Sequence, residues 1–101
     1  MKYTLIWSNP AKEDYWQNID FLIDNWSLPV AKKFIKTVDK FLKIIQNHPE
    51  TFANSGYKNV RSVPVVKQIT LFYRIDESNQ TIEIIRFWNN HQNPKRFKLK
   101  S

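Results

Sequence analysis

The first half of the chain shows one short alternating segment, followed by two longer segments with helical periodicity. Residues 2–7 (KYTLIW) alternate and favour β structure, which predicts a strand. Apolar residues then recur every three or four positions over residues 10–25, and again from Ser27 to the NHPE segment at 47–50, which predicts two helices. Asn9 and Ser27 are the expected N-caps. The short connection between the helices predicts an antiparallel hairpin.

The second half of the chain is rich in β-branched and aromatic residues and predicts three strands. These cover residues 57–63, 66–75 and 81–88, with a turn at 76–80. The order β-α-α-β-β-β predicts an α+β fold, with the N-terminal helical hairpin packed on one face of a small, mainly antiparallel sheet. The side chains of the long strand that we expect in the core are Ile69, Leu71, Tyr73 and Ile75. The last strand has no alternation that separates its two faces.

The composition narrows the class of protein without identifying it. A chain of 101 residues with 42% hydrophobic residues predicts one folded domain over residues 1–101. The formal net charge of +7 favours an acidic partner, which can be nucleic acid, an acidic protein or a membrane surface. The chain has no cysteine and a single glycine, which excludes disulfides, thiolate sites and glycine-rich phosphate loops. With only two histidines, we expect neither a metal site nor a cofactor.

The opening segment and the hydropathy of the chain predict where in the cell the protein lies. No apolar run approaches the ~20 residues that a membrane-spanning helix needs. The opening MKYTLIWSNP is too short and too polar for a signal peptide. A cytoplasmic protein without membrane contact is therefore expected.

Several stretches, in their order, resemble the RelE/ParE superfamily, the toxins of bacterial type II toxin–antitoxin systems. The most characteristic are the NHPE helix end, the strand FYRID and the closing RFWNNHQNP, and the resemblance covers about residues 3–97. It implies a small basic toxin of a plasmid-stabilisation system, which inhibits growth until an acidic antitoxin protein neutralises it in a hetero-oligomer. The net charge of +7 fits such a partner independently.

One branch of the superfamily cleaves mRNA on the ribosome without a metal. That chemistry needs an activated 2′-hydroxyl, a cation beside the developing charge and a proton donor for the leaving oxygen. The resemblance places Thr70 and His91 where arginines are common, and Phe97 where a tyrosine is common. Under this alternative His91 and Arg61 are the expected catalytic residues. Phosphate-binding cations would then be Lys58, Arg61 and Lys67.

The other branch, similar to ParE, inhibits DNA gyrase and requires no catalytic group. The long helical hairpin and the missing ribonuclease residues favour this branch. The residues expected to contact the target or the antitoxin are Arg61, Lys67, Arg74, Arg86, Trp88, Asn90, His91 and Gln92. A generic basic module that binds nucleic acid is a third hypothesis, and it predicts an affinity that falls steeply with salt.

Each of these residues also has a structural alternative. Arg74 can form a salt bridge with Asp76, Glu77 or a helix carboxylate, and Arg61 can be a solvated charge on an edge strand. The lysine ridge of the second helix, defined as Lys32, Lys36, Lys40 and Lys43, can be a solvated face. His48 is expected to end the second helix. The tryptophans expected to pack in the core or the hairpin are Trp7, Trp16 and Trp26, and Phe97 is expected to anchor the tail.

Overall fold

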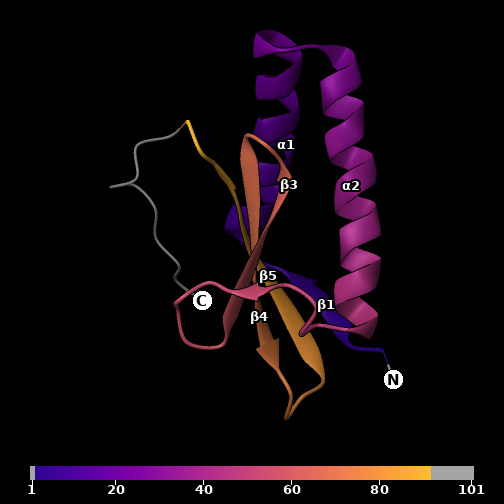
Figure 1. The fold of residues 1–101 in the computed structure, drawn as a ribbon, viewed down its shortest axis with the longest axis vertical. Coiled ribbons are helices and arrows are strands. Elements are labelled where there is room, and N and C mark those ends of the chain that lie inside the picture. Colours follow the sequence, from indigo (N-terminus) through magenta and orange to yellow (C-terminus); the bar gives the residue numbers. More distant parts are fainter. Residues whose placement is uncertain (1, 92–101) are drawn as a thin grey trace.

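The computed structural model describes residues 2–91, and over these residues two helices pack on a five-stranded sheet (Figure 1). The elements are, in chain order, β1 (Thr4–Trp7), α1 (Asn9–Asn25), α2 (Leu28–Asn47), β2 (Ala53–Asn54), β3 (Val60–Val66), β4 (Ile69–Asp76) and β5 (Thr81–Asn89). This confirms the predicted α+β class and the order of its helices and longer strands. The short β2 is an addition that the sequence pattern does not predict.

The strand order in the sheet is β1-β5-β4-β3-β2. All neighbouring pairs are antiparallel except β1 and β5, which are parallel, so the sheet is mainly antiparallel as predicted. Parallel neighbours need a long crossover connection, and the helical hairpin provides it. The first and the last strand therefore lie side by side, and β5 is an inner strand of the sheet.

Serine side chains cap both helices at their N-termini. Ser27 caps α2 as predicted, because its Oγ accepts a hydrogen bond from the backbone N–H of Val30. For α1 the expected cap Asn9 is wrong. Ser8 has the extended backbone of a cap and accepts from Ala11 N at 3.1 Å, so Asn9 is the first helical residue. Within residues 2–91, neither helix is long and apolar enough to cross a membrane.

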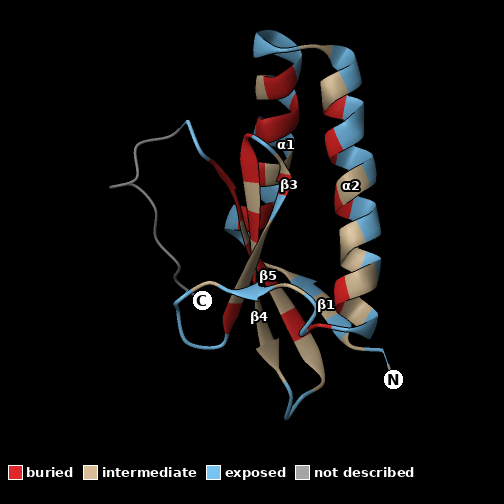
Figure 2. Cartoon of the chain, in the orientation of Figure 1, coloured by how far each residue is buried: buried red, intermediate tan, exposed pale blue. Residues whose placement is uncertain are grey.

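The core lies between the helical hairpin and one face of the sheet (Figure 2). From the expected face of β4, Ile69, Leu71 and Tyr73 are fully buried, and Ile75 packs partly buried against them. The α2 side chains buried in this core are Ala31, Phe34, Val38 and Ile45. Each buried aliphatic or aromatic side chain contributes about 1.5–3 kcal/mol, so this stripe holds α2 on the sheet.

A bulge in β5 explains why the pattern of the last strand does not reveal its two faces. Phe72 pairs with Arg86, but the next residue of β4, Tyr73, pairs with Ile84, so Ile85 has no cross-strand partner. An extra residue of this kind shifts the alternation by one position. Ile84 belongs to the core under the helices, whereas Ile85 is equally buried but lies outside that cluster.

Pro64 does not end the third strand, contrary to the prediction for residues 57–63. β3 continues through Pro64 to Val66. The only β3 residues that pair with β2 are Arg61 and Ser62, so Pro64 lies in a part of the strand that is a sheet edge. Proline is tolerated at such an edge because no neighbouring strand requires its missing N–H.

The three tryptophans that were expected to pack in the core or the hairpin differ in their burial. Trp7 packs on Tyr15 and Phe87, with ring centroids 5.4 and 5.3 Å apart. Trp16 and Trp26 are 66% and 53% exposed, so the expected burial is wrong for these two. The outer face of the hairpin consequently carries large apolar side chains.

Candidate functional site

The residues predicted to meet a target lie in two separate groups, at opposite ends of the sheet. Arg61 and Arg74 lie at one end and line an open groove of about 540 Å³ beside the β4–β5 turn, with Asp76 among the other lining residues. Lys67 and His91 lie at the other end. Lys67 lies six positions after Arg61, just past the end of β3, which corresponds to about 20 Å of extended chain. No single small ligand therefore reaches both groups.

Arg61 and Arg74 each bind an oxygen of a residue outside the groove lining. The Nη1 of Arg61 donates to the carbonyl oxygen of Phe52 at 2.7 Å, so Arg61 helps to hold the loop between α2 and β3. Arg74 forms a salt bridge at 3.6 Å, but with Glu83 rather than with the carboxylates proposed from the sequence. Arg74 and Glu83 are directly opposite in the β4–β5 register, which brings their side chains together.

The second group surrounds the end of β5. The backbone N–H of Asn90 donates to the carbonyl of Gln68 at 2.8 Å, and its side chain donates to the carbonyl of Lys67. The ring of His91 packs on Phe21 of α1 at 5.6 Å. Lys67, Asn90 and His91 are exposed, so this end presents polar and basic groups to solvent. The predicted contact Gln92 and the predicted anchor Phe97 lie outside the described residues.

Arg86 and Trp88, which lie between the two groups, are largely covered by other parts of the protein. The guanidinium of Arg86 binds both carboxylate oxygens of Asp14 on α1, at 2.6 and 2.9 Å. The Asp14 side chain is 7% exposed and that of Arg86 19% exposed. Trp88 is 8% exposed, and the Arg86 guanidinium lies 5.5 Å from its ring. These contacts make Arg86 and Trp88 part of the joint between α1 and β5.

The sequence did not predict a buried polar cluster that lies between α1 and β5. It consists of Asp14, Asn18 and Asn89, each at most 5% exposed as a whole residue, and it connects α1 to β5. A signal for it does exist in the sequence. Asp14 and Asn18 lie between Ala11 and Leu22 at spacings of three and four residues, on the buried face of α1. Polar residues within an apolar stripe indicate a buried hydrogen-bond network.

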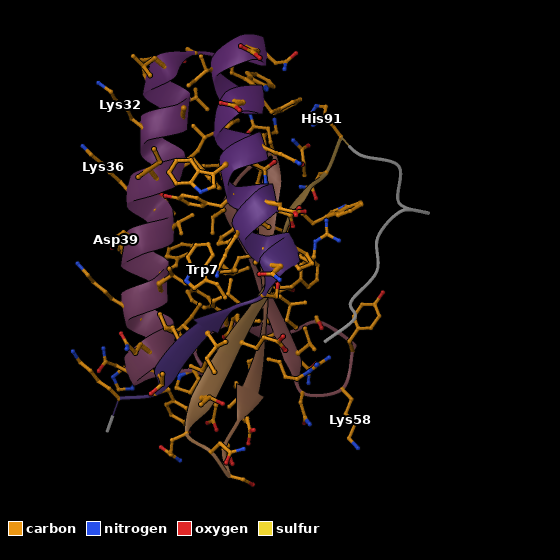
Figure 3. The ribbon with its side chains drawn as sticks, turned by 180° about the vertical axis from the view of Figure 1, so that it is seen from behind. Trp7, Lys32, Lys36, Asp39, Lys58 and His91 are labelled. Carbon is orange, nitrogen blue, oxygen red and sulfur yellow. The ribbon has the colours of Figure 1, made fainter. Side chains whose placement is uncertain are left out.

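A mainly apolar depression lies on another side of the molecule, between β1, α1 and α2. We call it the helix groove; its volume is about 430 Å³, and it is lined by Trp7, Tyr15, Ile35, Lys36, Val38, Asp39 and Leu42. Burial, and then the nearby Asp39 carboxylate, raises the pKa of Tyr15, so its hydroxyl stays neutral. Figure 3 shows Lys32 and Lys36 projecting outward from α2, whereas Lys58 lies at the opposite side.

A family comparison identifies the chain. The model of the ParE toxin of type II toxin–antitoxin systems, parDE, matches residues 5–94. The chain belongs to this toxin family. The resemblance seen in the sequence is thereby confirmed.

Solved structures with this fold include toxins of several bacteria. The chromosomal ParDE toxin–antitoxin system of P. aeruginosa matches with 19% identity and a TM-score of 0.69, over 87% of this chain and 96% of that chain. A mutant of E. coli toxin RelE in the free state matches with 14% identity and a TM-score of 0.64, over 90% and 86%. The RelBE2 toxin–antitoxin complex of Mycobacterium tuberculosis matches with 16% identity and a TM-score of 0.60, over 88% and 99%. At these identities the likeness shows the fold alone. No curated protein sequence matches the chain.

In this ParE-family toxin, the strand position at which the resemblance expects an arginine of the ribonuclease branch is occupied by the neutral Thr70, near the start of β4. Thr70 lies on β4 between Pro64 of β3 and Trp88 of β5. Within residues 2–91 every arginine has a partner, namely Phe52 O for Arg61, Glu83 for Arg74 and Asp14 for Arg86. Among the same residues, no three His, Asp or Glu side chains gather in a way that could hold a metal ion.

Proposed function

We propose that this ParE-family toxin inhibits growth by binding DNA gyrase rather than by cutting RNA. The observation that carries the proposal is the neutral Thr70 near the start of β4, where it pairs with Pro64 and Trp88. Cleavage by attack of a 2′-hydroxyl needs a cation next to the phosphate and an acid within hydrogen-bonding reach of the leaving oxygen. Thr70 provides neither group, and the guanidinium of Arg86, which lies over the neighbouring Trp88, is already bound by Asp14.

The positions of the remaining charges support the same proposal. Lys67 and His91 lie at one end of the sheet, about 20 Å from Arg61 along β3, whereas catalytic groups must act on one phosphate within a few ångströms. Arg61 and Arg74 already bind protein oxygens at the other end. Two separated polar ends suit contact with a large protein surface better than catalysis on a single bond.

We further propose that an acidic antitoxin neutralises the toxin by docking in the helix groove. Two of the structural neighbours come from toxin–antitoxin pairs. The groove offers an apolar floor that includes Trp7 and Leu42, and the lysine ridge runs along the same helix. A partner segment with aliphatic side chains and flanking carboxylates is complementary to this surface in shape and charge. A hetero-oligomer of toxin and antitoxin follows from this docking.

The target is tested with toxin that has been purified from its antitoxin complex and refolded. We expect micromolar toxin to block DNA supercoiling by gyrase, and primer extension on translated mRNA to show no new cuts. Undiminished supercoiling at high micromolar toxin would refute the gyrase proposal. New cuts at ribosomal A-site codons would instead establish the ribonuclease alternative, with His91 as the first residue to substitute.

The docking surface is tested by charge reversal. Lys36→Glu should weaken antitoxin binding by about tenfold, mainly through slower association, because rim charges steer encounter. Lys58→Glu is the matched control, since it makes the same change of charge at an exposed position on the opposite side (Figure 3). Equal effects of the two variants would show that only net charge matters, and would remove the argument for the helix groove.

A further inference from the structure

The outer edge of β5 is completed by a helix where its neighbouring strand ends. β1 pairs with β5 only as far as Ile84, whereas β5 continues to Asn89. Side chains of α1 and its cap occupy this edge. Ser8 Oγ donates to Ile85 O at 2.8 Å, Asp14 accepts from Phe87 N at 3.1 Å, and Asn18 Nδ2 donates to Phe87 O at 2.8 Å. They bind backbone groups that a further strand would otherwise pair.

The same network extends past the end of the strand to the exposed segment. Asn89 Nδ2 donates to Asn18 Oδ1 at 3.3 Å, and Asn89 Oδ1 accepts from the backbone N–H of His91 at 2.8 Å. The ring of His91 packs on Phe21 of the same helix. α1 thus holds His91 through two contacts, one with its backbone by way of Asn89 and one with its ring.

We infer that Asn18 and Asn89 are positioning residues, which set the orientation in which His91 is presented to the target. The inference rests on the proposed function, because it takes this end of the sheet as a target contact. Asn18 and Asn89 are each 3% exposed, and within residues 2–91 no buried side-chain polar atom lacks a partner. A buried amide whose hydrogen bonds are directional fixes one orientation of the backbone that it binds. An apolar side chain of similar volume would not fix that orientation.

The test compares a disruptive, a conservative and a control variant. Asn89→Ala removes both bonds of the side chain. Asn89→Asp keeps the acceptor for His91 N–H, but it replaces the donor to Asn18 with an oxygen and adds a buried charge. Asn25→Ala is the matched control, because its amide lies on α1 like that of Asn18 and bonds to Phe21 O in an exposed position.

The readouts are growth arrest after induction, which does not depend on the identity of the target, and antitoxin affinity, which reports an intact helix groove. Asn89→Ala should raise the toxin level needed for arrest by at least about tenfold, while antitoxin affinity changes less than about threefold. Asn89→Asp, which keeps the acceptor for His91 N–H, should retain more toxicity than Asn89→Ala, and Asn25→Ala should retain all of it. Full toxicity of Asn89→Ala, or parallel loss of toxicity and antitoxin affinity, would overturn the positioning role.

A separate measurement distinguishes failure of this inference from failure of the proposed function. If the wild type arrests growth without inhibiting gyrase, the gyrase proposal fails, and the variants still test the positioning role. If the wild type does not arrest growth, backbone amide exchange decides. The His91 N–H should be protected in the wild type and lose that protection in Asn89→Ala, with β4 unaffected. An unprotected His91 N–H in the wild type would contradict the inference.

Discussion

Replacing Asp14 by alanine should destabilise the fold more than any other change of a single charged side chain in residues 2–91. The substitution removes both oxygens that bind Arg86 and the acceptor of Phe87 N–H. Breaking one side of a buried ion pair costs about 3–5 kcal/mol, and an orphaned buried N–H costs about 1–3 kcal/mol. The Arg86 side chain is 19% exposed, so water relieves part of its loss. After this reduction, we expect a total loss of about 3–4 kcal/mol in the free energy of unfolding.

Urea denaturation followed by tryptophan fluorescence measures this loss, since the four tryptophans report on the fold. Asp14→Asn should cost about half as much, because its amide oxygen can still accept from Phe87 N–H. The control is Asp39→Ala, which removes the exposed pair with Lys43 and should cost about 0.5 kcal/mol or less. If Asp14→Ala costs no more than Asp39→Ala, the joint between α1 and β5 does not stabilise the fold as described.

Three further predictions concern the core, the pH dependence and the hairpin surface. Phe34→Ala, at a fully buried position, should cost about 3–5 kcal/mol in the same assay; a loss below about 1 kcal/mol would contradict the core assignment. Burial raises the pKa of Tyr73 to about 12 from 10.0, so stability should be complete below pH 10 and fall as the pH rises towards 12. Thermal melts of Tyr73→Phe should lack this fall, although the variant loses the bond to Pro49 O and about 1 kcal/mol at neutral pH. Trp16→Ala should change stability by less than about 0.5 kcal/mol, and a larger loss would show that this exposed ring is packed.

The sequence predicts those parts of the fold that depend on local periodicity. The stripe of α2 and the apolar positions of β4 are regular, so their buried faces follow from residue spacing. The bulge at Ile85 breaks the alternation, and nothing in the sequence near it marks the extra residue. Ser8 and Asn9 are both good caps, so composition does not choose between them, and the backbone conformation does.

The candidate site was less predictable, because its contacts join distant positions. Arg86 and Asp14 are 72 residues apart, and their ion pair depends on the packing of α1 against β5. Arg74 finds Glu83 only through the strand register. The sequence predicted contact residues near the end of β5, but it did not reveal that one of them, Arg86, is paired with Asp14. Lys67 and His91 remain candidates for target contact, because both are exposed and both lie at the same end of the sheet.

The pairing of β1 with β5 has a consequence for the order in which the fold assembles. Thr4 pairs with Thr81, so this pairing closes a loop that contains both helices, whereas only residues 77–80 separate β4 from β5. The longer loop costs about 2 kcal/mol more in chain entropy. We therefore expect the meander of β3, β4 and β5 to form early, and the first strand of the chain to join last.

Until β1 joins, the edge of β5 that carries Ile82 and Ile84 is open. Strands of this apolar kind pair with other chains when their edges are unprotected. The folding intermediate, rather than the finished toxin, is then the form most prone to self-association. A slow step in refolding that disappears when β1 is tethered beside β5 would reveal this late docking.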